Sequence, residues 1–121
     1  MTVNVTAVND APTVVNDTDS VTEGGTVTET TNSAGTVISD DSDTDGDSLS
    51  VSGTVTQTSA TDTSGSSITI NSPNSASVGS AVTGYYGQLT LNSNGTYSYV
   101  ANQSNADALD SGESALSLIH I

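Results

Sequence analysis

The sequence predicts an all-β fold, a two-layer sandwich with Greek-key connections. Val and Thr, which favour strands, dominate its regular segments. No segment of ten or more residues has the apolar spacing of an amphipathic helix. Short stretches of alternating apolar and polar residues recur about every ten residues, separated by Gly, Asn, Asp and Ser, which is typical of sandwiches.

The first predicted strand covers residues 2–8, where Val3 and Val5 share one face. The alternation breaks at residues 9–12, where Pro12 removes a backbone donor and favours a stiff linker. Further strands are predicted at residues 13–15, 20–29 with a turn at Gly24 and Gly25, 36–38, 48–57 and 68–70. Residues 58–67 and 71–84 are predicted to be loops, and residues 105–109 could form one helical turn.

The clearest hairpin covers residues 88–100, and its register can be argued. A two-residue turn at 94–95 would place the tyrosines on the face opposite the leucines. A three-residue loop at 93–95 instead pairs Leu91 with Tyr97, and the preceding leucine with the following tyrosine. Since only the second register gathers the apolar side chains on one face, the sequence predicts the bulged loop.

The charge balance is extreme: the chain has fourteen acidic residues, no Lys and no Arg, and a formal charge of -14. Self-repulsion at this level opposes compaction unless cations from solution offset it. The lack of Lys and Arg argues against nucleic acid as a partner, and against an anionic membrane surface. No stretch has the length of a membrane span, so membrane insertion is not expected. A dissolved cation is the expected partner.

Residues 39–47, here called the acidic loop, hold five of the fourteen acidic residues. Asp41, Asp43, Asp45 and Gly46 match the first half of an EF-hand loop. The second half does not match, because Ser52 stands where the bidentate Glu belongs. Oxygen ligands favour a hard ion such as Ca²⁺. The predicted ligands are Asp41, Asp43, Asp45 and Asp47, and the alternative is a solvated turn between two strands.

Five segments in order resemble the VCBS-type repeat, a cadherin-like module found in tandem in very large bacterial adhesins. They are DSVTEGGT at residues 19–26, SDTDGDSL at 42–49, GYYGQLTLN at 84–92, GTYSY at 95–99 and ALDSGE at 108–113. The resemblance implies an immunoglobulin-like sandwich and calcium at module junctions. It also implies an extracellular or cell-surface location, after export by a type I system as part of a longer chain.

The resemblance adds candidate calcium ligands outside the loop: Glu23, and Asn9 with Asp10 in the linker. Asn9 and Asp10 could equally be plain linker residues. It also divides the chain into the end of a preceding repeat with its linker (1–12), the repeat itself (13–113) and an atypical tail (114–121). This tail differs from the Thr-, Phe-, Tyr- and Val-rich final strand of the family and suggests a truncation or scar. The final strand is therefore expected to be missing or replaced, leaving an open sheet edge.

The expected function is that of a non-enzymatic adhesive or spacer module, with neighbouring repeats and host or matrix glycans as partners. The single histidine, His120, has no paired nucleophile motif, so no catalytic site is expected. The alternative is a carbohydrate- or ice-binding module. Threonine pairs at 26–28 and 54–56 would serve ice binding, and Tyr85 and Tyr86 would either stack on a sugar or pack in the core.

Overall fold

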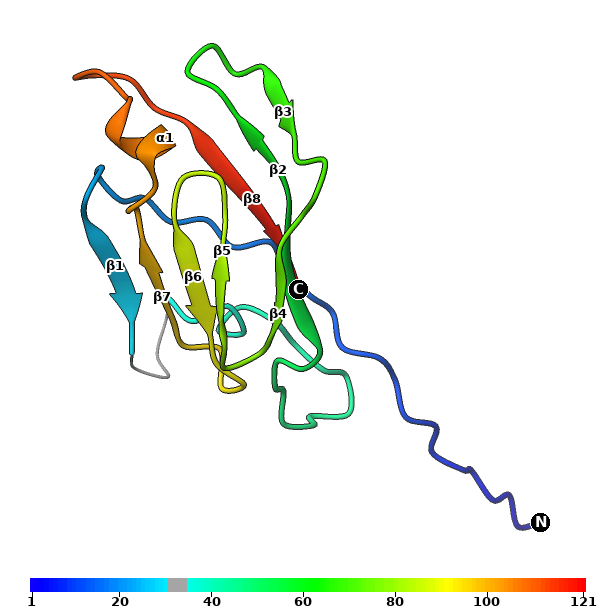
Figure 1. Cartoon of the computed structure of the whole chain (residues 1–121). Helices are drawn as coiled ribbons and strands as arrows, with labels where there is room; N and C mark the ends of the chain where they lie inside the picture. Colours follow the sequence, from blue (N-terminus) through cyan, green and yellow to red (C-terminus); the bar gives the residue numbers. More distant parts are fainter. Residues whose placement is uncertain (31–34) are drawn as a thin grey trace.

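The computed structural model describes residues 1–30 and 35–121 and contains two antiparallel sheets and one short helix (Figure 1). The first sheet has the strand order β1-β7-β6-β5. In the second, β3 and β4 lie along one edge of β2, and β8 lies along the other. The elements are β1 (Thr26–Glu29), β2 (Thr54–Thr61), β3 (Ser67–Thr69), β4 (Ser75–Ser77), β5 (Ala81–Thr83), β6 (Gln88–Leu91), β7 (Tyr97–Val100), α1 (Ser104–Asp107) and β8 (Leu116–His120). The all-β sandwich prediction is confirmed, while the Greek-key connection stays a prediction.

The core lies between the inner faces of the two sheets and has two parts. Toward the β6–β7 turn, Val55 of β2 packs with Val82 of β5 and Leu91 of β6, each with 3% exposure or less. Toward α1, Ala60 and Ala106 pack with the buried ring of Tyr86 and with Ala101. Contacts from both sheets in each cluster bury the apolar side chains that the alternation provides.

The β6–β7 hairpin has the predicted bulged register: Leu91 pairs with Tyr97, and Leu89 with Tyr99. The turn closes through the N–H of Gly95, which donates to the Asn92 carbonyl at 3.0 Å. Gly95 has φ +81°, the left-handed conformation that the three-residue loop requires.

The tail forms a strand, β8, so of the two outcomes expected for the last strand, missing or replaced, the structure has the second. Strand β8 runs antiparallel to β2, with Leu116 opposite Thr61 and His120 opposite Thr56. The buried Gln57 of β2 fixes this pairing, because its Nε2 donates to Ser117 Oγ at 2.7 Å. The alternation of Leu116 to His120 is enough for an edge strand. Its second edge has no strand partner in residues 1–30 and 35–121, so the expected open edge is present.

The predicted strand at residues 2–8 is wrong. These residues are exposed, form no ladder, and extend away from the sandwich (Figure 1). Alternation supplies a face to bury, but a strand also needs a neighbouring backbone, and no backbone in residues 1–30 or 35–121 pairs with this segment. Three other early strands were predicted. Residues 20–29 form a strand only from Thr26 to Glu29, residues 13–15 make only a bridge from Thr13 to Ser42, and residues 36–38 consist of one bridge residue, Thr36, and a turn.

The strand predicted at 48–57 is displaced toward the C-terminus. Gly53 has φ +91°, which interrupts the extended backbone, so β2 begins at Thr54 and continues into the predicted loop to Thr61. Strands β4 and β5 occupy a stretch predicted to be a loop. Both are three residues long and contribute few apolar side chains, so their sequences carry little alternation. Pairing with β2 and β6 specifies them instead.

Candidate metal-binding loop

The acidic loop is held at both ends on the β6–β7 turn. Val37 N–H donates to the Gly95 carbonyl at 3.1 Å, before the loop, and Val51 N–H donates to the Ser93 carbonyl at 2.9 Å, after it. Thr36 is buried beneath Gly95, with 1% exposure. The space is so tight that a Cβ atom on Gly95 would lie 2.7 Å from Ile38 Cγ1. The most regular hairpin in the chain therefore anchors the acidic loop.

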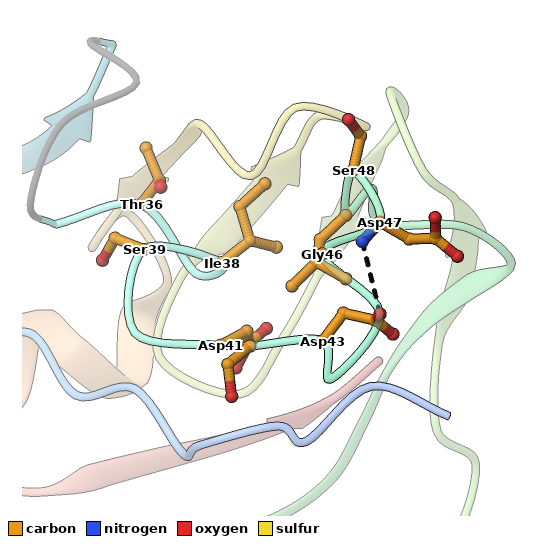
Figure 2. Close-up of a pocket in the computed structure, with 10 residues that line it drawn as sticks. Thr36, Ile38, Ser39, Asp41, Asp43, Gly46, Asp47 and Ser48 are labelled. Atoms are coloured by element: carbon orange, nitrogen blue, oxygen red, sulfur yellow. Dashed lines mark hydrogen bonds between the residues drawn. The ribbon is translucent and has the colours of Figure 1, made fainter. Parts of the chain in front are cut away.

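Within the loop, one carboxylate organises the turn. Asp43 Oδ1 accepts the N–H of Asp45 at 2.9 Å and the N–H of Asp47 at 3.3 Å, the second of which is drawn in Figure 2. The Asp43 carbonyl accepts Gly46 N–H at 3.2 Å. Gly46 has φ +78°, which a side chain would disfavour. The hydrogen bonds that Asp43 and Gly46 make within the turn are therefore enough to account for an Asp and a Gly at these positions.

The N-terminal linker, residues 9–15, lies hydrogen-bonded across the loop. Thr13 and Ser42 exchange backbone hydrogen bonds of 2.7 and 3.0 Å. On either side of this bridge, Val15 N–H donates to Asp41 Oδ1 at 2.8 Å and Asp10 N–H donates to Asp45 Oδ2 at 2.7 Å. Linker and loop therefore form one unit at this end of the sandwich.

The linker meets the loop through its backbone. Asp10 uses its N–H toward Asp45, and Asn9 Nδ2 donates to the Asp10 carbonyl at 3.0 Å. The sequence argument expected the side chains of Asn9 and Asp10 to point at a shared ion. The structure brings Asp10 to the loop, but its recorded contact there is a hydrogen bond from its main chain.

The oxygen donors of the loop suit a hard cation, but they are not gathered around one point. No hydrogen bond among the described residues uses the second carboxylate oxygen of Asp41, Asp43 or Asp45. Within residues 1–30 and 35–121, however, no three Asp, Glu, His or Cys side chains are grouped closely enough to hold a metal ion. Figure 2 shows the Asp47 carboxylate directed away from that of Asp41. Coordination would require these side chains to turn toward a common ion.

Glu23 does not join this group. It lies in the turn before β1, where Gly24 N–H donates to the Ala101 carbonyl at 2.8 Å. Ala101 follows the C-terminal end of β7, whereas the turn that anchors the acidic loop precedes its N-terminal end. Glu23 and the acidic loop are therefore at opposite ends of the first sheet (Figure 1).

Asp17 is a residue that the sequence argument missed. Partial burial raises the pKa of its carboxyl, and the charges of Asp40 and Asp41 raise it further. Asp17 is therefore within electrostatic reach of the loop. Its spacing from the loop in sequence gave no sign of this, because the linker places it there by crossing at Thr13 and Val15.

The tyrosine and threonine candidates lie elsewhere. The Tyr86 ring is core, with 8% exposure, and its hydroxyl donates to the Thr61 carbonyl at 2.9 Å. Tyr85 packs edge-on against it, with ring centroids 5.0 Å apart, and lines a hollow together with four residues that have amide side chains. Those residues are Gln57, Asn74, Gln103 and Asn105. The threonine pairs of β1 and β2 belong to different sheets and so form no common face.

Comparison with known proteins gives no relative: no protein family matches the chain, and neither does any curated protein or solved structure. None of the helical residues that the structure describes forms a helix long and apolar enough to cross a membrane.

Proposed function

We propose that this chain is a non-enzymatic, calcium-stabilised structural and adhesive repeat of a large bacterial surface or secreted adhesin. The observation that carries the proposal is the junction between the N-terminal linker and the acidic loop. A linker hydrogen-bonded across a carboxylate-rich loop is where an ion could stiffen the connection between successive modules. The motifs that resemble the VCBS-type repeat support the same function, and imply export by a type I system.

The charge distribution gives the proposed ion an energetic role. Two carboxylates about 6 Å apart repel by roughly 0.7 kcal/mol in water, and by more beside a low-dielectric surface. The five acidic residues of the loop lie near Asp10 of the linker and within electrostatic reach of Asp17, and the chain has no Lys or Arg to offset them. A divalent ion bound by Asp43, Asp45 and a third carboxylate would remove this repulsion and fix the linker.

Thermal unfolding with and without calcium tests the proposal. After treatment with chelator, we expect millimolar Ca²⁺ to raise Tm by about 10 °C, equivalent to about 2.7 kcal/mol when free calcium is a hundredfold above the dissociation constant. The double variant Asp43→Asn, Asp45→Asn should lose this rise. The control Asp107→Asn, Asp110→Asn removes the same charge near α1 and should retain it. Equal stability in chelator and in calcium would refute the proposal.

Sugar binding is a second candidate function, favoured by the hollow beside Tyr85. The amide donors of Asn74 and Asn105 are engaged by backbone carbonyls, at 2.8 and 3.1 Å, which holds both side chains in place. Such fixed amides beside an aromatic ring suit the hydroxyls and apolar face of a sugar. Screening on a glycan array should then show binding that Tyr85→Ala abolishes. Binding that the Asn74→Ala, Asn105→Ala variant leaves unchanged would exclude this hollow.

A further inference from the structure

Exposed large apolar side chains are confined to two parts of the described chain. One is the N-terminal stretch, where Val3 has 67% exposure and Val5 has 91%. The other is the C-terminal end, where Leu116 has 50%, Leu118 has 39% and Ile121 has 60%. In a soluble chain, apolar residues concentrated in this way indicate surfaces that are covered by a partner.

The C-terminal part is an open edge. Strand β8 pairs with β2 along one side, and no described strand pairs with the other. Leu116 and Leu118 stand opposite Thr61 and Ser59 of β2, on the outer face of the sheet. Edges of this kind are usually protected by charge, by proline or by a bulge, and β8 itself has no charged residue and no proline. It can accept another strand.

The N-terminal segment, residues 2–8, has the sequence of a strand but no sheet to join. It alternates as a strand should, yet no backbone in the described part of the chain pairs with it. The contacts of Asp10 and Thr13 with the acidic loop direct it away from its own sandwich, as Figure 1 shows. In this arrangement residues 2–8 form no ladder with β8 of the same chain.

The distribution of charge favours contact between copies at these two surfaces over contact elsewhere on the molecule. Copies of a chain with formal charge -14 repel one another, most strongly where the acidic loop and its linker lie. Residues 2–8 and β8 contain no acidic side chain. Two copies can approach through these surfaces at the lowest electrostatic cost.

We propose that residues 2–8 of one copy add as a strand to the free edge of β8 in a second copy. New backbone hydrogen bonds give the contact its affinity, and Val3 and Val5 cover Leu116 and Leu118 on the outer face. The contact is heterologous, since each copy offers a donor segment at one place and an acceptor edge at another. Copies therefore join head to tail into chains whose length grows with concentration.

Sedimentation velocity on the intact chain over a wide concentration range tests this. We expect the mean mass to rise with concentration. Val5→Pro should raise the dissociation constant at least about tenfold, because proline removes a ladder donor. Leu118→Asp should do the same by placing a carboxylate on the acceptor edge. The control Ser72→Asp adds the same charge at an exposed bend away from both surfaces, and should assemble like the unmodified chain.

Mixing the two variants tests the direction of the contact. The Val5→Pro copy retains a good edge and the Leu118→Asp copy retains a good donor segment, so an equal mixture should form dimers that cannot extend. Circular dichroism and Tm identify any variant that has lost its fold, in which case Val5→Asp or Leu116→Asp replaces it. A chain that stays monomeric at all concentrations, variants that assemble as before, or a mixture without dimers would each overturn the proposal.

Discussion

The strands and the acidic loop with its linker differ most in their charge. Across the part of the chain that the structure describes, Glu29 is the only acidic residue in a strand, whereas the acidic loop alone has five. The strands pair through Thr, Ser and aliphatic side chains, and their inner faces form the core. The difference separates two sources of stability: burial holds the sheets together, and conditions in solution act on the loop and linker.

The largest expected loss of stability comes from a substitution in the core, and it should not depend on calcium. Leu91 has 1% exposure and packs with Val55 and Val82, so Leu91→Ala removes buried atoms and leaves a cavity. We expect unfolding in urea to show a loss of about 2 to 5 kcal/mol. The loss should be equal in chelator and in calcium.

Leu116→Ala is the control for Leu91→Ala. Its side chain has 50% exposure, and the expected loss is below about 1 kcal/mol. If the cost of Leu91→Ala changed greatly with calcium, burial and charge would not be separate sources of stability in this fold.

The next effect separates hydrogen bonding from charge within the acidic loop. Asp43→Ala removes the acceptor that Asp45 and Asp47 share, and we expect a loss of about 1 to 2 kcal/mol in chelator. Asp43→Asn keeps a side-chain oxygen acceptor and removes one negative charge. It should be at least as stable as the unmodified chain in chelator, measured by urea unfolding. A loss as large as that of Asp43→Ala would show that the charge itself holds the turn.

A smaller effect is expected from Tyr97 at high pH. Burial, together with the hydrogen bond from its hydroxyl to Asp19, raises the pKa of Tyr97 from 10.0 to about 12. Because the folded state favours the neutral phenol, this stabilisation is complete below pH 10 and is lost as pH rises toward 12. Between pH 9 and 12, the Tm of Tyr97→Phe should therefore fall less steeply with pH than the Tm of the unmodified chain. Tyr86 and Tyr99, whose pKa values are also raised, should account for the slope that persists.

The same division of the molecule explains which parts of the fold the sequence could predict. The β6–β7 hairpin followed from residues within it, because both its register and its turn depend on neighbours less than fifteen positions apart. Short strands such as Ser75–Ser77 did not, since they owe their conformation to pairing with β2. For the tail, the sequence left open whether a final strand forms, for the same reason: the strand exists because β2 offers an edge and Gln57 donates a hydrogen bond to Ser117.

For the candidate site, the sequence located the acidic loop but not its surroundings. The order of Asp and Gly from Asp41 to Asp47 is local and was visible. The hydrogen bonds that hold the ends of the loop go to Gly95 and Ser93, in a turn that is distant in sequence. The position of Asp17 near the loop depends on the N-terminal linker, which is also distant in sequence. Glu23 was placed with the loop by resemblance alone, and it lies at the other end of the first sheet.

The smallest expected effects come from two aspartates whose pKa values shift in opposite directions. Asp17 has a raised pKa, from burial first and then from Asp40 and Asp41, so its ionised form destabilises the folded state. Asp62 has a lowered pKa, because it accepts hydrogen bonds from the Ser64 hydroxyl and from the N–H groups of Ser66 and Ser64.

At pH 7, Asp17→Asn should therefore stabilise the chain, by less than about 1 kcal/mol, and Asp62→Asn should slightly destabilise it. Measuring the free energy of unfolding of both variants and of the unmodified chain from pH 7 to pH 3 checks the direction of each change. The advantage of Asp17→Asn should disappear as pH falls through the raised pKa of Asp17 toward 3.8, because protonation then removes the same charge. The deficit of Asp62→Asn should disappear as pH falls from 3.8 through the lowered pKa of Asp62, where its carboxylate is lost. If both variants shifted stability in the same direction at pH 7, total charge alone would govern the loops. Opposite signs would mean that the position of each carboxylate decides, so that a bound cation should stabilise the acidic loop far more than the Asp62 turn.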